Sequence, residues 1–270
     1  MTSYFTPNGN VPPQTTMITS KAVVREAYVI IPASSMTDNV RSILPDWRNT
    51  RCWVLAAPAI GFATAFAEYL VFLDQGGGCD RPEVEAGGES FLFVLDGELT
   101  ITVDGRTETY DGGGFAFVPP DTPWAVRNDA SNPAKFLWIR KAFEPLGDLR
   151  PAPILRHERD VPIVRNPTSD QKWTHNLIPT NDIAYDMHMN MVSFGPGATI
   201  SAIETHIMEH GLYMLQGKGM YLFNEQWHEV EAGDFIWMRA FCPQAFYAGG
   251  PGPARYLLYK NMNRQIKLRS

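Results

Sequence analysis

The chain has 270 residues, 44% hydrophobic and 19% charged, which is ordinary for a soluble globular protein of one large or two smaller domains. The net charge of −6 and the scattered basic residues argue against a nucleic-acid surface. No apolar run approaches the roughly 20 residues of a membrane span, and no signal-peptide pattern occurs, so we expect no membrane partner. The three cysteines, Cys52, Cys79 and Cys242, have no metal or redox spacing, and their odd number argues against a disulfide framework. We therefore expect a cytoplasmic protein.

Residues 1–20 are rich in Pro, Ser and Thr, and we expect a flexible N-terminal arm there. The chain then alternates short runs rich in Val, Ile, Phe, Tyr and Trp with turns of Gly, Pro, Asp and Asn, which predicts an all-β sandwich or barrel. The strands predicted in the first half are Tyr28–Ile31, Cys52–Leu55, Thr64–Leu73, Ser90–Leu95, Leu99–Val103, Phe115–Val118 and Lys135–Arg140.

Few other elements are expected. Val103-Asp-Gly-Arg106 predicts a hairpin, because Asp-Gly tolerates the positive φ angles of a tight turn. Residues Asp38–Trp47 could hold one or two helical turns. The segment 146–160 is rich in proline and charge and predicts a linker between an N-terminal domain (21–145) and a C-terminal domain (161–270).

After the linker the pattern of the first half begins again. Phe91-Leu-Phe-Val-Leu-Asp-Gly97 aligns with Gly211-Leu-Tyr-Met-Leu-Gln-Gly217 at a shift of 120 residues. The same shift aligns Phe136-Leu-Trp-Ile-Arg140 with Tyr256-Leu-Leu-Tyr-Lys260. A gapless register over about fifty residues indicates an internal repeat and therefore two like domains.

The second half contains polar residues that suit a metal ion. Glu204 and His206 are two residues apart, so their side chains point to the same face of a strand. His210 follows after a short turn, and Gln244 lies in a segment that could fold back onto the others. Carboxylate and imidazole ligands together suit a divalent manganese, iron, zinc or nickel ion.

The repeat serves as an internal control for this cluster. At the shift of 120 residues the four polar residues fall opposite Val84, Ala86, Ser90 and Trp124. No histidine occurs before His157. The four residues are thus replaced as a set, which favours a shared function in the second half alone.

These residues resemble the two sequence motifs of the cupin family. The positions that follow the spacing of those motifs are Gly197, Glu204, His206, His210, Gly217, Gly233 and Gln244. Compared with the usual cupin ligands, Glu204 stands for the first His, His210 for the Glu and Gln244 for the last His. The resemblance implies an all-β bicupin, two tandem jelly-roll barrels with few short helices, of which only the C-terminal barrel carries metal ligands.

The altered ligand set resembles one bicupin family, the (S)-ureidoglycine aminohydrolases. The matching stretches in the second domain are Ile203-Glu-Thr-His-Ile-Met-Glu-His-Gly211, Gly217-Lys-Gly-Met-Tyr221, Gly233-Asp-Phe-Ile-Trp-Met238, Pro243-Gln-Ala245 and Tyr256-Leu-Leu-Tyr-Lys-Asn-Met-Asn-Arg264. The first domain matches more loosely, through Glu68-Tyr-Leu70, Glu89-Ser-Phe-Leu-Phe93 and Val118-Pro-Pro120.

This resemblance implies a manganese-dependent hydrolase of purine (allantoin and allantoate) catabolism that converts (S)-ureidoglycine to (S)-ureidoglycolate and ammonia. The implied metal ligands are Glu204, His206, His210 and Gln244, and the implied substrate contacts are Tyr221, Tyr256 and Lys260. Lys260 could bind the substrate carboxylate or assist the departing amine, and Glu204 could act as a ligand alone or also take a proton from water. Iron, nickel and zinc remain alternatives to manganese.

Two other functions remain open at this point. One is a different cupin metalloenzyme, a dioxygenase or an isomerase, and the other is a non-catalytic bicupin that binds a small molecule. By analogy with other bicupins we also expect the chain to form a homo-oligomer. The family resemblance implies that its binding partner is a small anionic ureido substrate.

Overall fold

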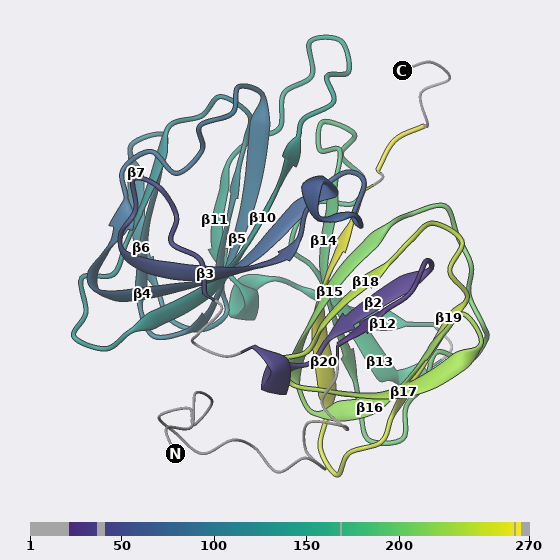
Figure 1. The fold of residues 1–270 in the computed structure, drawn as a ribbon. Coiled ribbons are helices and arrows are strands. Elements are labelled where there is room, and N and C mark those ends of the chain that lie inside the picture. The colour runs from purple at the N-terminus through teal and green to yellow at the C-terminus, as the bar shows by residue number, and fades with distance from the viewer. Residues whose placement is uncertain (1–21, 37–40, 168, 262, 266–270) are drawn as a thin grey trace, which may run out of the picture.

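The computed structural model describes residues 22–36, 41–167, 169–261 and 263–265, which form two β-barrels side by side (Figure 1). Within these residues the helices are three short 3-10 turns, η1 (Ala33–Ser35), η3 (Pro58–Ile60) and η4 (Glu158–Asp160). The predicted all-β class is confirmed, whereas the predicted arm over 1–20 lies outside the described residues. No described helix is long and apolar enough to cross a membrane. All three cysteines are buried and unpaired, as expected.

The first barrel is a nine-stranded antiparallel sheet. Its strands are β3 (Arg48–Ala56), β4 (Ala67–Cys79), β5 (Gly88–Asp96), β6 (Leu99–Val103), β7 (Arg106–Tyr110), β8 (Gly114–Val118), β9 (Trp124–Arg127), β10 (Ala134–Ala142) and β11 (Ile154–His157). The predicted hairpin joins β6 to β7, with Asp104 and Gly105 at φ 49° and 77°. The strand predicted from Thr64 begins at Ala67 instead, because the N–H groups of Thr64 and Ala65 donate to the carboxylate of Glu209.

The second barrel consists of an eight-stranded and a three-stranded antiparallel sheet. The strands of the larger sheet are β1 (Val23–Val24), β2 (Tyr28–Ile31), β12 (Ile163–Asn166), β13 (Ser169–Asn176), β14 (His188–Phe194), β15 (His210–Gln216), β18 (Phe235–Met238) and β20 (Ala254–Lys260). The strands of the smaller sheet are β16 (Lys218–Phe223), β17 (Gln226–Glu231) and β19 (Gln244–Ala248).

The internal repeat is visible in the backbone. Gly97 and Gly217, which are 120 residues apart, have nearly equal φ angles of 74° and 72°. A Cβ atom on either glycine would lie 2.4 or 2.3 Å from a carbonyl oxygen, that of Pro133 in the first barrel and that of Pro253 in the second. Both barrels therefore need a glycine at this turn, for the same steric reason.

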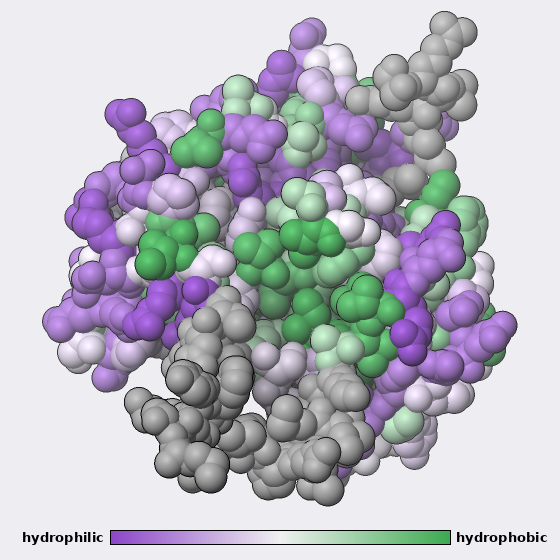
Figure 2. All heavy atoms as spheres, viewed as in Figure 1, coloured by the Kyte–Doolittle hydropathy of each residue, from purple (hydrophilic) through white to green (hydrophobic). Residues whose placement is uncertain are grey.

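The strands divide the buried side chains among three cores. One core fills the first barrel, a second fills the second barrel, and the third lies between the barrels and draws on both. Figure 2 shows apolar side chains gathered where the barrels meet, flanked by hydrophilic outer surfaces. Because side chains alternate along a strand, residues of β14, β15 and β20 point in turn into the second barrel and towards the first. This alternation places the predicted site inside the second barrel.

Two segments contradict the predicted domain boundaries. Strand β2, assigned to the first domain, pairs with β18 and so belongs to the second barrel (Figure 1). Strand β11, from the predicted linker, pairs with β8 and completes the first barrel. Each segment satisfies its backbone hydrogen bonds on an edge strand that would otherwise be open, so each barrel is closed by a segment from outside its predicted bounds.

The predicted helix over Asp38–Trp47 is wrong where it can be compared. Residues 38–40 lie outside the described residues, and 41–47 are not helical. Ser42 instead forms a β-bridge with Cys52, with backbone hydrogen bonds of 2.7 and 2.8 Å. Pro45 favours this extended path, because a proline disfavours helical backbone at the preceding residue.

Candidate metal centre

Backbone hydrogen bonds fold Gln244 back onto the motif that contains the predicted ligands. Glu204 and Gln244 form an isolated antiparallel bridge, in which the N–H of each donates to the carbonyl of the other at 2.9 Å. Nearby, the N–H of Phe241 donates to the carbonyl of His206 at 2.7 Å. The loop that carries Glu204 and His206 is therefore held against the start of β19.

The side chains of His206, His210 and Gln244 meet at one point. The Nε2 atom of His206 lies 3.0 Å from Nε2 of His210 and 2.8 Å from Nε2 of Gln244. The hydroxyl of Tyr221 donates to Oε1 of Gln244 at 3.0 Å, so it orients the amide. His210, Gln244 and Tyr221 are buried, and His206 is half-buried.

Both imidazoles are disposed to be neutral, as a metal ligand must be, and the ring of His210 is also oriented by a hydrogen bond. Burial, reinforced by the positive charge of Lys260, lowers the pKa of His206 and lowers that of His210 far below its usual range. Nδ1 of His210 donates to the carbonyl of Glu209 at 3.0 Å, which leaves a lone pair on Nε2. A half-turn of the Gln244 amide would bring its oxygen to the same place, and the Tyr221 hydroxyl would then accept from the amide nitrogen. These three side chains therefore fit a divalent ion with borderline ligand preference.

Glu204 is the predicted ligand that the structure leaves outside this contact group. Its side chain is exposed, and no three His, Cys, Asp or Glu side chains of the described residues are grouped so as to hold a metal ion. Its negative charge nevertheless acts on the site. It opposes the lowering of the pKa of His206 and Lys260 by burial, and it adds to the raising of the pKa of Tyr221 and Tyr256 by burial.

Lys260 lies at the end of β20, between two histidine-bearing strands. It pairs in register with His188 on β14 and with His210 on β15. Burial lowers the pKa of its ammonium group, Glu204 opposes that shift, and Lys172 adds to it. Lys260 takes part in none of the ion pairs formed within the described ranges, so its charge is available to a ligand.

Two further polar side chains near the site were missed from the sequence. Asn190 is buried, and its Oδ1 atom has no hydrogen-bond partner. It shares the inward face of β14 with Val192, whereas Met189 and Met191 point to the core between the barrels. Lys172 and Glu204 line a cavity of about 440 Å³ beside the site. The alternation of methionines with His188 and Asn190 along this segment was the signal that pointed to an inward polar face.

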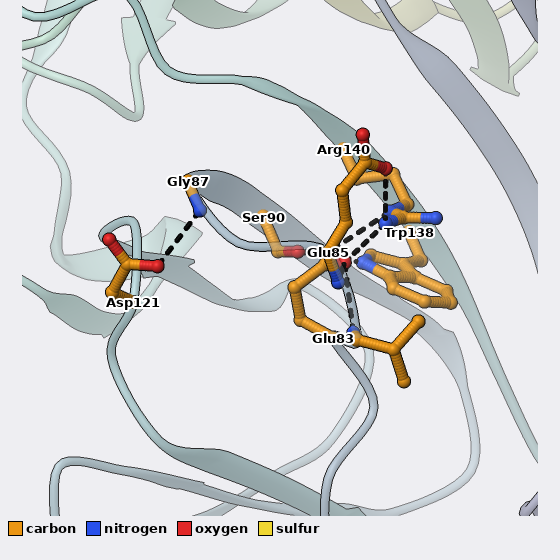
Figure 3. A network of polar contacts seen from close by, with 8 residues as sticks. Glu83, Glu85, Gly87, Ser90, Asp121, Trp138 and Arg140 are labelled. Atoms are coloured by element: carbon orange, nitrogen blue, oxygen red, sulfur yellow. Dashed lines mark hydrogen bonds and ion pairs between the residues drawn. The ribbon is translucent and has the colours of Figure 1, made fainter.

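The corresponding region of the first barrel is built differently (Figure 3). Ser90 stands where the second barrel has His210, and its hydroxyl accepts from Nε1 of Trp138 at 3.0 Å. Arg140 stands in place of Lys260, and its Nε donates to the carboxylate of Glu83 at 2.8 Å. A cavity of about 500 Å³ lies beside Trp124 in this barrel. Arg140 is already neutralised by Glu83, and the residues opposite the predicted ligands are Val84, Ala86, Ser90 and Trp124, which do not suit a metal ion. The first barrel therefore does not hold the predicted centre.

Comparisons with known proteins decide the family. The Cupin domain model matches residues 70–140 and 190–259, one match in each barrel. The (S)-ureidoglycine aminohydrolase of Arabidopsis thaliana is 30% identical over 246 residues, which span 91% of this chain and 79% of that protein. The chain belongs to the cupin family and, within it, to the (S)-ureidoglycine aminohydrolases. The (S)-ureidoglycine aminohydrolase of Escherichia coli K12 is 28% identical over 254 residues, which span 93% of this chain and 95% of that protein.

A solved structure of a related protein has the same overall fold as this chain. The putative glyoxylate-induced protein from Pseudomonas aeruginosa is 44% identical to this ureidoglycine aminohydrolase family member, and each chain covers 99% of the other. The TM-score of the two structures is 0.87. The bicupin fold predicted from the repeat is therefore confirmed.

Proposed function

We propose that this chain hydrolyses (S)-ureidoglycine to (S)-ureidoglycolate and ammonia, as a step of purine catabolism. The bond between the central carbon and the amine nitrogen breaks, the oxygen of water becomes bonded to that carbon, and the amine leaves as ammonia. The names of the relatives support the substrate. The convergence of His206, His210 and Gln244 inside one barrel is the observation that carries the proposal.

We propose manganese as the metal, held by His206, His210, Gln244 and the carboxylate of Glu204. Gln244 is neutral, so the protein contributes only one negative charge and the site can accept an anionic substrate. When bound there, the ion would act as a Lewis acid and would orient the carboxylate and the amine of the substrate, so that one face of the central carbon is presented.

Residues around the proposed metal supply the remaining contacts. The ammonium of Lys260 is a partner for the substrate carboxylate or a proton donor to the departing amine, since it forms no salt bridge within the described residues. The unpartnered Oδ1 of Asn190 is an acceptor suited to the N–H groups of a ureido substituent. The hydroxyl of Tyr221 holds the Gln244 amide. The ring of Tyr256 packs beside the ring of Tyr221, with the two centroids 6.3 Å apart.

The direct test uses purified, manganese-loaded protein and freshly generated ureidoglycine. We expect ammonia release well above the spontaneous rate and a single enantiomer of ureidoglycolate. Spontaneous-rate decay with metal bound would rule out the proposed activity.

The same preparation discriminates the competing functions. A cupin dioxygenase would consume oxygen, so ammonia release at an unchanged rate under anaerobic conditions excludes that class. A bicupin that only binds small molecules would show saturable binding of ureidoglycolate without turnover of ureidoglycine.

A further inference from the structure

Two glutamates occupy equivalent positions in the two barrels, and both face the other barrel. Glu89 and Glu209 are 120 residues apart and are buried, with 0% and 3% of their surface exposed. Glu89 lies 3.7 Å from Lys141 of its own barrel, and this lysine pairs with Asp186 of the second barrel at 2.5 Å. The repeat thus places one carboxyl group on each side of the contact between the barrels.

Glu209 receives hydrogen bonds from both barrels. From the first barrel, the N–H and the hydroxyl of Thr64 donate to its carboxylate at 2.6 and 2.9 Å, and the N–H of Ala65 donates at 3.2 Å. From the second barrel, Nε1 of Trp237 donates at 2.7 Å. Four donors satisfy a buried carboxylate that forms no salt bridge with any described residue, which is what a buried charge requires.

The same residue is bonded to a proposed metal ligand. Strand alternation directs the side chain of Glu209 towards the first barrel and that of His210 into the second. The carbonyl of Glu209 accepts from Nδ1 of His210 at 3.0 Å, which selects the tautomer with a lone pair on Nε2. The N–H of Glu209 donates to Oδ1 of Asn261 at 3.0 Å, so the peptide is held on both sides.

We propose that Glu209 is a positioning residue through which the first barrel, which has no ligands of its own, completes the metal centre of the second. The donors of Thr64 and Ala65 fix the carboxylate, the carboxylate fixes the peptide, and the peptide carbonyl orients His210. This inference rests on the proposed role of His210 as a ligand.

Glu209→Gln tests the proposal, because the amide nitrogen of glutamine cannot accept from the N–H donors that face the carboxylate. We expect this variant to bind Mn²⁺ about ten- to a hundredfold more weakly in a metal titration, as other partners of metal-bound histidines do when replaced. The matched control is Glu89→Gln, which changes the equivalent glutamate of the first barrel, whose ion-pair partner is Lys141 of its own barrel. It is expected to retain the Mn²⁺ affinity of the parent protein.

Thr64→Val keeps the test open if Glu209→Gln does not fold. Valine preserves the branched shape and removes only the hydroxyl donor, more than 140 residues before His210 in the chain. We expect Mn²⁺ affinity to fall several-fold in Thr64→Val. Parent affinity in both Thr64→Val and a folded Glu209→Gln would overturn the proposal, as would an equal loss in Glu89→Gln.

A measurement without metal or substrate separates this inference from the proposed function. In the metal-free protein, nitrogen-15 NMR of the histidine side chains should detect His210 protonated at Nδ1 alone, and Glu209→Gln should turn it into a mixture of tautomers. An unchanged tautomer in a folded Glu209→Gln would contradict the positioning role even in a protein that hydrolyses ureidoglycine. Conversely, failure of the hydrolysis assay would leave this NMR result standing.

Discussion

The two barrels have the same backbone plan and differ in what occupies equivalent places. In the first, Trp138 donates to Ser90, and Arg140 is neutralised by Glu83. In the second, His210 meets His206 and Gln244, and Lys260 has no ion pair within the described part of the chain. The fold therefore needs none of the polar residues of the second barrel, and their presence there as a connected set indicates function.

The strongest test of this comparison exchanges equivalent residues for alanine. His210→Ala should abolish stoichiometric Mn²⁺ binding and ureidoglycine hydrolysis, because it removes a buried imidazole whose Nε2 faces His206. Ser90→Ala should leave both unchanged and cost about 1 kcal/mol of stability, since the indole N–H of Trp138 loses its acceptor. Metal analysis of the purified variants measures the first effect, and equal metal content in the two variants would break the comparison.

A second test of the comparison between the barrels replaces the equivalent cations, Arg140 on β10 and Lys260 on β20. Lys260→Ala should lower kcat/KM about a hundredfold, the scale of a lost acid or charge contact to the substrate, with metal content retained. A loss confined to KM would assign the ammonium to the substrate carboxylate, and a loss in kcat would assign it to the leaving amine. Arg140→Ala should keep full activity and lose about 1–3 kcal/mol of stability, because Glu83 is left without its guanidinium.

A buried carboxyl group of the first barrel makes the stability of the protein depend on pH. Burial raises the pKa of Glu68 in the first barrel from its ordinary 4.5 to about 8. The unfolded chain loses this proton near 4.5 and the folded chain near 8, so the contribution of Glu68 to stability is full below pH 4.5 and is lost as the pH rises to 8. Glu68→Gln should therefore raise the free energy of unfolding by about 2–3 kcal/mol at pH 7 and leave it unchanged near pH 4. Urea denaturation at both pH values measures this, and a pH-independent difference would refute it.

The smallest expected effect concerns the hydroxyl that orients Gln244. Tyr221→Phe removes the hydroxyl that holds the Gln244 amide in either of its two orientations, while keeping the ring that stacks on Phe223 at 4.4 Å. We expect about tenfold weaker Mn²⁺ binding and an unchanged fold. In the first barrel the equivalent position is Ile101, and Ile101→Val should leave the Mn²⁺ affinity at the parent value.

The sequence predicted the barrels because their signals are local. Alternating apolar residues, the Asp104-Gly105 turn and the paired glycines at 97 and 217 each fix a short stretch of backbone without knowledge of its neighbours. The choice of partner strand is not local. A strand such as Tyr28–Ile31 has the same pattern in either barrel, and only its pairing with β18 shows that it belongs to the second.

The sequence predicted those parts of the site that have a local spacing signal and missed those that depend on contacts with the other barrel. The spacing of His206 and His210 and the repeat singled out residues that the structure brings together with Gln244, while Glu204 stands outside their contact group. Glu209 was missed, because a glutamate beside a histidine carries no spacing signal and its donors lie in the other barrel. Its recurrence as Glu89 at the shift of 120 residues was the available clue.

Anomalous diffraction from crystals of the manganese-loaded protein tests the central asymmetry most directly. We predict one manganese peak per chain, bounded by Glu204, His206, His210 and Gln244, with none beside Ser90 and Trp124 of the first barrel. A peak in the first barrel, or a manganese ion in the second barrel held without His206 and His210, would contradict the account.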